Sequence, residues 1–266
     1  MGEGNKQFEN EIISGALSAD MMDYLLRDGY FTGAEHAKID HNRITNSFEV
    51  YKNKLALQSS ALVNFETMMI SRFQMFKAVY FHKTVRAGEV MLLEAMSLAD
   101  DYLGLSKMNV ESYMIQTDDS ILQQLTSLPE DTSELKAAKK IATDYQDRKL
   151  FKCVFEKTIS GKKSFGRNKL KQFREDIAKK SKLAESQIFI DTSTTHSMPL
   201  APSKKESSSI ILIKKEGSKV IPKTIPISEI PLVSSMSGKM NILRAYTQQK
   251  NRNKVEIAAK SILGEL

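Results

Sequence analysis

The sequence predicts a mainly α-helical body over residues 1–160, followed by a smaller α+β region over residues 161–266. Three observations support this fold class. Apolar residues recur at helical spacing through most of the first segment. Beyond residue 160 the composition becomes basic, and short runs typical of β-strands follow. The hydrophobic content of 41% and the charged content of 27% are those of an ordinary globular protein.

The first predicted helix begins near Ser18, whose hydroxyl can cap it. It ends within residues 29–33, a segment with a glycine at its first and last positions. Asp20, Tyr24 and Asp28 recur every four residues and therefore share one face of this helix. Such a face is costly to bury unless something binds it. From the residues alone, a solvated amphipathic helix and a small binding site both stay open.

The next elements follow from similar patterns. Residues 48–57 indicate a hairpin with Lys52 and Asn53 at its turn. Helices are expected over residues 59–76 and 79–105, from Thr117 or Asp118 onward, and over residues 134–149. In the last third we expect a strand at 188–190, a hairpin over 208–225 with residues 216–217 at its turn, a strand at 240–246 and a final helix over 251–266.

Residues 160–183 carry nine Lys or Arg against two acids. A basic stripe of this kind can bind nucleic acid or acidic lipid. However, Leu170, Phe173, Ile177 and Leu183 form an apolar stripe at helical spacing, which favours a helix packed on the body with a solvated charged face.

Composition narrows the possible environments and partners. The net charge of +7 favours anionic partners such as nucleotides or nucleic acid. Cys153 is the sole cysteine, which excludes an intrachain disulfide and a cysteine-ligated zinc site. A reducing compartment is then the default, and we expect a cytoplasmic protein. The sequence contains no apolar run of membrane-spanning length, and the polar residues 1–12 do not form a signal peptide, so no membrane association is expected.

Three blocks of the sequence resemble a known family. Residues 14–33 read SGALSADMMDYLLRDGYFTG, residues 71–86 read SRFQMFKAVYFHKTVR, and residues 113–122 read YMIQTDDSIL. These blocks closely resemble signatures of the HD-superfamily dNTP triphosphohydrolases, relatives of the sterile-alpha-motif-and-HD-domain enzyme. The segments DRKLFK (147–152) and KMNILRAY (239–246) resemble later parts of the same family. The resemblance covers nearly all of this chain and the C-terminal part of a family member, so it implies an HD-phosphohydrolase-like helical body.

The resemblance implies roles for individual residues. Enzymes of this family bind a divalent metal through a histidine, a contiguous His-Asp pair and a distant Asp, and the metal activates a water that attacks phosphorus. The matched positions are Asp20 for the distant metal-binding Asp, Tyr24 and Asp28 for contacts to the nucleotide sugar, Arg72 for a phosphate contact and Tyr80 for stacking on the sugar. If residues 71–86 form one continuous helix, Arg72 and Tyr80 lie two turns apart on one face.

His82, Lys83 and Arg86 supply further donors suited to phosphate. The alternative is that Lys83 and Arg86 lie on a solvated face while His82 packs against the neighbouring aromatic residues. Both interpretations stay open.

The sequence also departs from the family. Its histidines stand at positions 36, 41, 82 and 196, and none precedes an aspartate, so the His-Asp pair is missing. We expect no catalytic residue within this chain, and a Mn, Mg, Fe or Zn ion would need ligands from a partner. Met21 stands where many members carry Lys or Arg, and Ser18 replaces a frequent Asp.

Three hypotheses for function follow. In the first, the chain is part of a metal-dependent phosphohydrolase acting on deoxynucleoside triphosphates, inactive without a partner that carries the histidine ligands. In the second, it is a catalytically dead module for nucleotide sensing or oligomerisation. In the third, it is a basic nucleic-acid-binding protein. The expected partners are a dNTP or another nucleotide, further copies of the chain, or a chain with the missing histidine segment.

Overall fold

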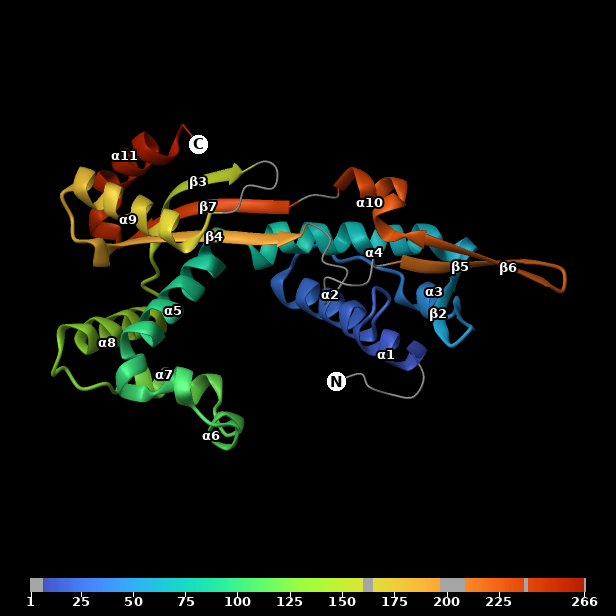
Figure 1. Cartoon of the computed structure of the whole chain (residues 1–266), viewed down its shortest axis with the longest axis horizontal. Helices are drawn as coiled ribbons and strands as arrows, with labels where there is room; N and C mark the ends of the chain where they lie inside the picture. The colour runs from blue at the N-terminus through green and yellow to red at the C-terminus, as the bar shows by residue number, and fades with distance from the viewer. Residues whose placement is uncertain (1–6, 160–164, 197–208, 237–238, 266) are drawn as a thin grey trace. The chain divides into compact units, whose positions relative to one another are not determined.

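The computed structural model describes residues 7–159, 165–196, 209–236 and 239–265. The chain forms two compact units, each built from separate segments. Unit 1 contains Met1–Phe81, Ser160–Lys162 and Thr194–Met240, and unit 2 contains His82–Ile159, Lys163–Ser193 and Asn241–Leu266. Helices dominate both units, and the strands form two small sheets, which confirms the predicted fold class (Figure 1). The division at residue 160 stays a prediction.

Unit 1 combines helices from the first third of the chain with a hairpin from the last third. Its elements are α1 (Gln7–Ser14), α2 (Ala19–Thr32), α3 (His41–Thr45), β1 (Phe48–Tyr51), β2 (Lys54–Gln58), the 3₁₀ turn η1 (Ser59–Ala61), α4 (Leu62–Met75), the π-helical turn η2 (Phe76–Tyr80), β5 (Ser209–Glu216), β6 (Lys219–Pro226), η5 (Ile227–Glu229) and α10 (Pro231–Met236).

Helix α2 begins and ends where its sequence signals predict. The Ser18 hydroxyl accepts a hydrogen bond of 3.2 Å from the backbone N–H of Met21, the N-cap arrangement. At the other end Gly33 adopts a left-handed conformation with φ 69°, and its N–H bonds to the carbonyls of Gly29 and Tyr30. Between these caps, Leu25 and its apolar neighbours are buried in the core of unit 1.

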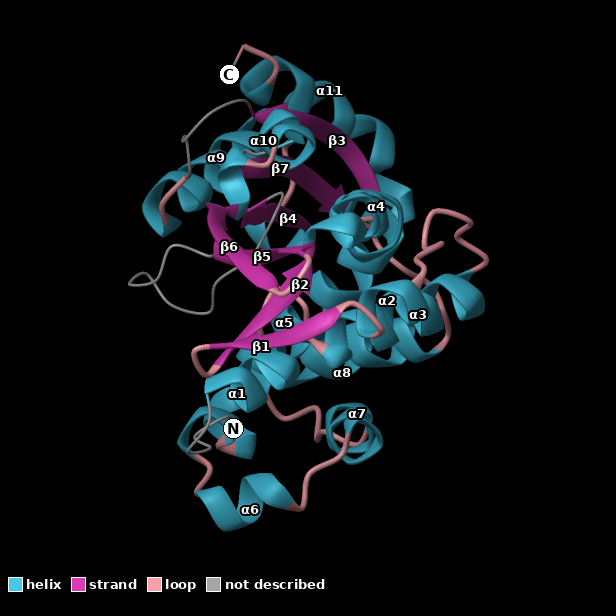
Figure 2. Ribbon diagram, turned by 90° about the vertical axis from the view of Figure 1, so that its right-hand side faces the viewer, coloured by secondary structure: helices cyan, strands magenta, loops and turns pink. Residues whose placement is uncertain are grey.

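The sheet of unit 1 joins two hairpins that are distant in sequence. Both Lys52 (φ 48°) and Asn53 (φ 64°) have positive φ, as the tight turn between β1 and β2 requires. The strand order is β1-β2-β5-β6, with β2 parallel to β5 and Gln58 opposite Ile213 (Figure 2). The sequence predicted each hairpin but not the parallel pairing that joins them. Pro222 in β6 lacks a backbone donor, which protects this edge from further strand pairing.

Unit 2 contains the long helix α5 and the C-terminal elements. They are α5 (Lys83–Leu103), η3 (Leu105–Lys107), α6 (Val110–Met114), α7 (Asp118–Thr126), α8 (Ser133–Gln146), β3 (Lys152–Ile159), α9 (Arg167–Ser181), η4 (Glu185–Gln187), β4 (Ile188–His196), β7 (Lys239–Thr247), η6 (Gln249–Asn251) and α11 (Arg252–Leu263).

The sheet of unit 2 has the strand order β3-β7-β4 and separates two apolar clusters. Leu243 and Ala245 of β7 pack with α9 and α11, whereas Tyr246 packs with α5, α7 and α8. This alternation is the period of two of a strand buried on both faces. The sequence did not predict β3, because charged residues such as Lys152 and Glu156 interrupt its apolar pattern.

Helix α9 confirms the amphipathic interpretation of the basic region. Phe173 and Ile177 are buried in the core of unit 2, while most of the Lys side chains of α9 face solvent. Lys162 and Lys163, which belong to the same basic run, lie outside the described residues. In the described part of the chain, every helix is too short or too polar to cross a membrane.

Candidate functional site

Four of the residues that the sequence singled out come together in unit 1. Tyr24 and Asp28 lie one turn apart on α2, Arg72 lies on α4, and Tyr80 ends the π-helical turn. The Tyr80 hydroxyl donates a hydrogen bond of 2.7 Å to Oδ2 of Asp28. One Nη of Arg72 donates a short hydrogen bond to the Tyr24 hydroxyl. We call these four residues the Arg72 cluster.

Arg72 is held by aromatic rings rather than by a carboxylate. Its residue is only 8% exposed, and its guanidinium carbon lies 4.9 Å from the ring centre of Phe76 and 5.7 Å from that of Tyr24. Its Nε is buried and has no hydrogen-bond partner among the described residues. Within that part of the chain no carboxylate forms an ion pair with Arg72. A cation held in this way keeps its full charge and a spare donor.

Burial shifts the pKa values of Arg72, Tyr24 and Tyr80 in this cluster. Desolvation lowers the pKa of Arg72, while the phenols of Tyr24 and Tyr80 and the carboxylate of Asp20 act in the opposite direction. Burial also raises the pKa of Tyr24, which Arg72 partly offsets. The pKa of Tyr80 is raised by burial and by its hydrogen bond to Asp28. Both phenols are therefore neutral at pH 7, where the Tyr24 hydroxyl accepts a hydrogen bond from Arg72 and the Tyr80 hydroxyl donates one to Asp28.

Asp20 lies in the first turn of α2 with an exposed side chain. Its charge acts on both Tyr24 and Arg72, so it belongs to the same face. Divalent metal sites in proteins combine several oxygen, nitrogen or sulfur ligands. Within the residues that the structure describes, no three His, Cys, Asp or Glu side chains lie close enough to hold a metal. These residues therefore do not fit a complete metal site, and Asp20 offers at most one ligand of a larger set.

Residues 71–86 do not form one continuous α-helix, which was the condition for placing Arg72 and Tyr80 on one α-helical face. After Met75 it widens into a π-helical turn, in which the N–H of Phe81 bonds to the carbonyl of Phe76 at 2.8 Å. The chain then becomes extended at His82, and α5 begins at Lys83 instead of residue 79. Hydrophobic periodicity does not reveal such a turn, because one extra residue per turn changes the pattern too little.

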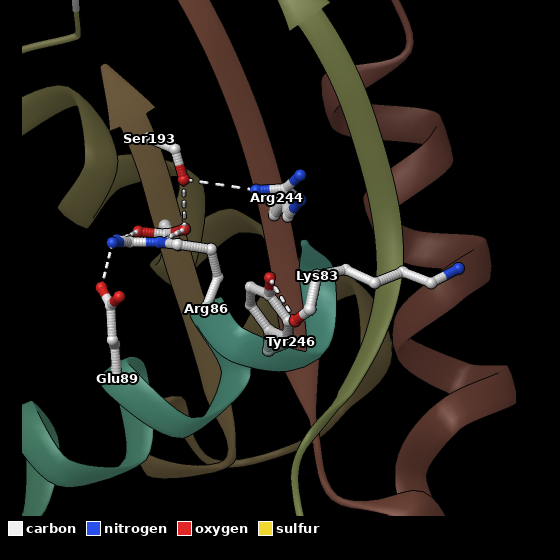
Figure 3. Close-up of polar contacts among 7 residues, drawn as sticks. Lys83, Arg86, Glu89, Ser193, Arg244 and Tyr246 are labelled. Carbon is white, nitrogen blue, oxygen red and sulfur yellow. Dashed lines mark hydrogen bonds and ion pairs between the residues drawn. The ribbon is translucent and has the colours of Figure 1, made fainter. Parts of the chain in front are cut away.

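The three candidate phosphate ligands belong to unit 2. His82 and Lys83 are exposed at the start of α5, where Nδ1 of His82 accepts a hydrogen bond of 3.3 Å from the N–H of Thr84. The Lys83 carbonyl accepts a hydrogen bond of 3.1 Å from the Tyr246 hydroxyl (Figure 3). The ammonium of Lys83 points away from this contact in the same view. A phosphate role for these two residues stays a prediction.

Arg86 is engaged inside unit 2 (Figure 3). Its Nε and Nη2 donate to the two carboxylate oxygens of Asp191 at 3.0 and 2.5 Å, and its Nη1 forms an ion pair with Glu89. The Asp191 side chain is 7% exposed, and its hydrogen bond raises the pKa of Arg86. A phosphate contact by Arg86, which stays a prediction, would have to compete with this bidentate pair.

The polar network that continues from Asp191 was not predicted from the sequence. The Ser193 hydroxyl donates to Oδ2 of Asp191 at 3.1 Å, and Arg244 donates to Ser193 at 3.2 Å and to Glu156 at 2.7 Å. Asp191 and Ser193 are two residues apart on β4 and therefore share a face. That spacing of polar residues after the apolar run at 188–190 was the available signal.

Comparison with known proteins places the chain in a family. Residues 39–264 match the family described as the HD associated region. Because this match spans most of the chain, the chain belongs to that family, and it is related to phosphohydrolases of the HD superfamily. The resemblance that the sequence motifs indicated is thereby confirmed.

Individual relatives match over part of their length. An uncharacterized protein of Methanocaldococcus jannaschii is 39% identical over 95 residues, which is 34% of this chain and 21% of the relative. A Dictyostelium discoideum protein described as a deoxynucleoside triphosphate triphosphohydrolase SAMHD1 homolog is 29% identical over 177 residues, 66% of this chain and 34% of the relative. The chain thus spans about a fifth to a third of these curated relatives.

A solved structure shares the fold. The crystal structure of a phosphohydrolase from Bacteroides thetaiotaomicron VPI-5482 superposes with a TM-score of 0.62 at 21% sequence identity. The match covers 93% of this chain and 65% of that protein. At this identity the likeness is one of fold.

Proposed function

We propose that the Arg72 cluster is the nucleotide-binding part of an HD-family phosphohydrolase that acts on deoxynucleoside triphosphates. The observation that carries the proposal is the buried guanidinium of Arg72, which has no carboxylate partner among the described residues. Burying a charge is costly unless it is paired. A phosphate group would supply the missing negative charge and accept the spare donors.

The rest of the cluster suits the sugar of a nucleotide. The half-buried Tyr80 ring offers an apolar face, and the carboxylate of Asp28 can accept a hydrogen bond from a hydroxyl group. The class of substrate is supported by the Dictyostelium relative, whose name describes hydrolysis of deoxynucleoside triphosphates. We extend that substrate class to this chain as part of the proposal.

Hydrolysis needs more than the described residues offer. A divalent metal in an HD site polarises a phosphate and activates a water. Asp20 would be one ligand, and the histidines and the His-Asp pair would come from an HD segment on the same polypeptide or on a partner. The contribution of the Arg72 cluster is then to bind and orient the nucleotide beside that site.

A nucleotide-sensing module that no longer catalyses is the second candidate. It is favoured by the lack of a complete metal-ligand set in the described part of the chain. The two candidates differ when an HD segment with its histidines is supplied: the enzyme hypothesis predicts metal-dependent release of triphosphate, and the sensor hypothesis predicts binding without turnover. Nucleic-acid binding by α9 stays a weaker hypothesis, because the apolar face of that helix is buried.

The surface of unit 2 supports association with another polypeptide. Val110, Tyr113, Met114 and Ile115, in and directly after the short helix α6, are 69%, 72%, 77% and 77% exposed. Adjacent apolar side chains with this exposure are unusual on a monomeric surface. We include self-association, or association with an HD-bearing partner, in the proposed function.

Calorimetric titration of the 266-residue chain with dATP tests nucleotide binding. We expect saturable binding that Arg72→Ala and Tyr80→Ala abolish. Arg27→Ala is the matched control, because it removes a cation from the exposed Arg27–Asp23 pair and should leave binding unchanged. Absence of binding by the wild-type chain, or equal binding by Arg72→Ala, overturns the proposal. Metal-dependent hydrolysis by the purified chain alone would contradict the need for further ligands.

A further inference from the structure

Two partly buried arginines of this chain are stabilised in opposite ways. The guanidinium of Arg86 is neutralised by the bidentate carboxylate of Asp191 and by Glu89. The guanidinium of Arg72 instead lies between the rings of Phe76 and Tyr24. A ring face attracts a cation through its quadrupole and leaves the net charge in place. Only the second arrangement preserves a full positive charge for an incoming anion.

Phe76 lies one α-helical turn after Arg72, because its N–H bonds to the Arg72 carbonyl, and the π-helical turn that leads to Tyr80 begins there. The shared face that we expected for Arg72 and Tyr80 on a continuous α-helix was wrong, because eight residues make two turns plus about 80° and rotate Tyr80 well away from Arg72. The wider turn over Phe76–Tyr80 reduces this rotation. As a result the Tyr80 hydroxyl reaches Asp28, while the ring of Phe76, one regular turn after Arg72, lies 4.9 Å from the Arg72 guanidinium.

Phe76 also contacts the rings on either side of it. Its ring centre lies 4.9 Å from that of Tyr80 at an interplanar angle of 63°, and 5.6 Å from that of Phe81 at 78°. Edge-to-face contacts of this kind fix the orientation of a ring. The surface that Phe76 presents to Arg72 is therefore held in place from two sides.

We propose that Phe76 is a positioning residue, which holds the Arg72 guanidinium against Tyr24 without neutralising it and thereby keeps its charge available to a bound anion. The anion-binding part rests on the proposed function, whereas the contact between ring and cation is a property of unit 1 alone. A carboxylate in the place of Phe76 would pair with Arg72 and compete with the anion. The proposal thus predicts that the chemical character of residue 76 matters more than its volume.

Nuclear magnetic resonance of the arginine side chains tests the ring contact without any ligand. In the wild-type chain, the Nε proton of Arg72, assigned by its loss in Arg72→Ala, should exchange slowly with water and show a ring-current shift. Phe76→Leu should reduce the ring-current shift to the part that Tyr24 contributes and speed the exchange at least about tenfold. Phe76→Tyr and Phe76→Trp should retain both signatures, and so should Phe73→Leu, a control on α4 whose ring faces no cation among the described residues.

Titration with dATP tests the consequence for binding. Phe76→Leu should bind about tenfold more weakly, the size expected when one desolvated cation–π contact is lost. Phe76→Tyr and Phe73→Leu should stay within about twofold of the wild-type chain. Phe76→Glu should bind dATP more weakly than Phe76→Leu, because the new carboxylate pairs with Arg72. Circular dichroism checks that this variant is folded.

The outcomes separate this inference from the proposed function. If Arg72→Ala abolishes binding but Phe76→Leu and Phe76→Glu bind like the wild-type chain, Phe76 has no positioning role and the proposed function stands. If the wild-type chain binds no dATP, the proposed function fails and the resonance of Arg72 alone decides the ring contact. An unchanged Arg72 resonance in Phe76→Leu overturns the inference in either case.

Discussion

The hydroxyl of Tyr80 donates a hydrogen bond of 2.7 Å to the carboxylate of Asp28, although 52 residues separate them in sequence. This bond links the π-helical turn to α2 at one end of the Arg72 cluster, and the contact between Arg72 and Tyr24 links α4 to α2 at the other. The cluster is thus a pair of cross-links between two packed helices as well as a candidate binding site.

Tyr80→Phe removes only the hydroxyl of this bond and keeps the ring. We expect the free energy of unfolding to fall by about 1 kcal/mol, the usual loss for one hydrogen bond, and the affinity for dATP to fall about threefold. Urea denaturation and calorimetric titration measure the two effects. Tyr30→Phe is the control, since Tyr30 is 82% exposed and its loss of a hydroxyl should change neither quantity.

Asp191→Asn tests the buried ion pair of unit 2. The substitution keeps the shape of the side chain but leaves the guanidinium of Arg86 without its bidentate carboxylate. Removing one partner of a buried pair costs about 3 kcal/mol or more, and we expect a loss of stability of that order in urea denaturation. Asp23→Asn, in the exposed pair with Arg27, should cost less than about 0.5 kcal/mol. Similar losses from both substitutions would argue against a structural role for the Asp191 network.

Tyr246 makes the stability of the protein sensitive to alkaline pH. Burial raises the pKa of its phenol above the ordinary value of 10.0. The folded chain therefore retains the phenolic proton in a range where the unfolded chain releases it. In this range the unfolded chain binds fewer protons than the folded chain. The free energy of unfolding therefore falls as pH rises above 10, by up to about 1.4 kcal/mol per pH unit for this group.

Urea denaturation between pH 8 and pH 11 measures this effect. Tyr246→Phe should be less stable at pH 8, because the hydrogen bond to the Lys83 carbonyl is lost. Its stability should nevertheless decline less steeply above pH 10. Parallel curves for the two proteins would show that another group controls the alkaline transition.

The exposed side chains after α6 should promote association of the chain with itself. Replacing Met114 and Ile115 together by lysine should shift the protein toward the monomer in size-exclusion chromatography with light scattering, because charge opposes burial of this patch. Val63→Lys is the control, since Val63 is 68% exposed on α4. A wild-type chain that is monomeric at every concentration tested would contradict the prediction.

Local signals predicted local structure well. The hydroxyl of Ser18 and the glycine at position 33 marked both ends of α2, because caps act within one turn of a helix. Lys52 and Asn53 marked the first hairpin turn. These interactions involve neighbours in sequence, so the residues themselves carry the information.

Contacts between residues far apart in sequence could not be predicted in the same way. The pairing of β2 with β5 and the network from Asp191 to Arg244 depend on residues that the fold alone brings together. Within the candidate site, spacing alone placed Tyr24 and Asp28 on one face of a helix, whereas Arg72, Tyr80 and the roles of all four residues came from the resemblance to a family. Phe76 was not named, because an aromatic residue at helical spacing is most often core.

The parallel pairing of β2 with β5 has a consequence for biosynthesis. Residues 54–58 leave the ribosome long before residues 209–216, so the β1–β2 hairpin must wait for its partner strand while 150 intervening residues are made. Contacts this distant in sequence form slowly, because a long loop has to close first. A nascent chain that stops before residue 209 carries α2 and Arg72 but leaves one edge of β2 unpaired and open to aggregation.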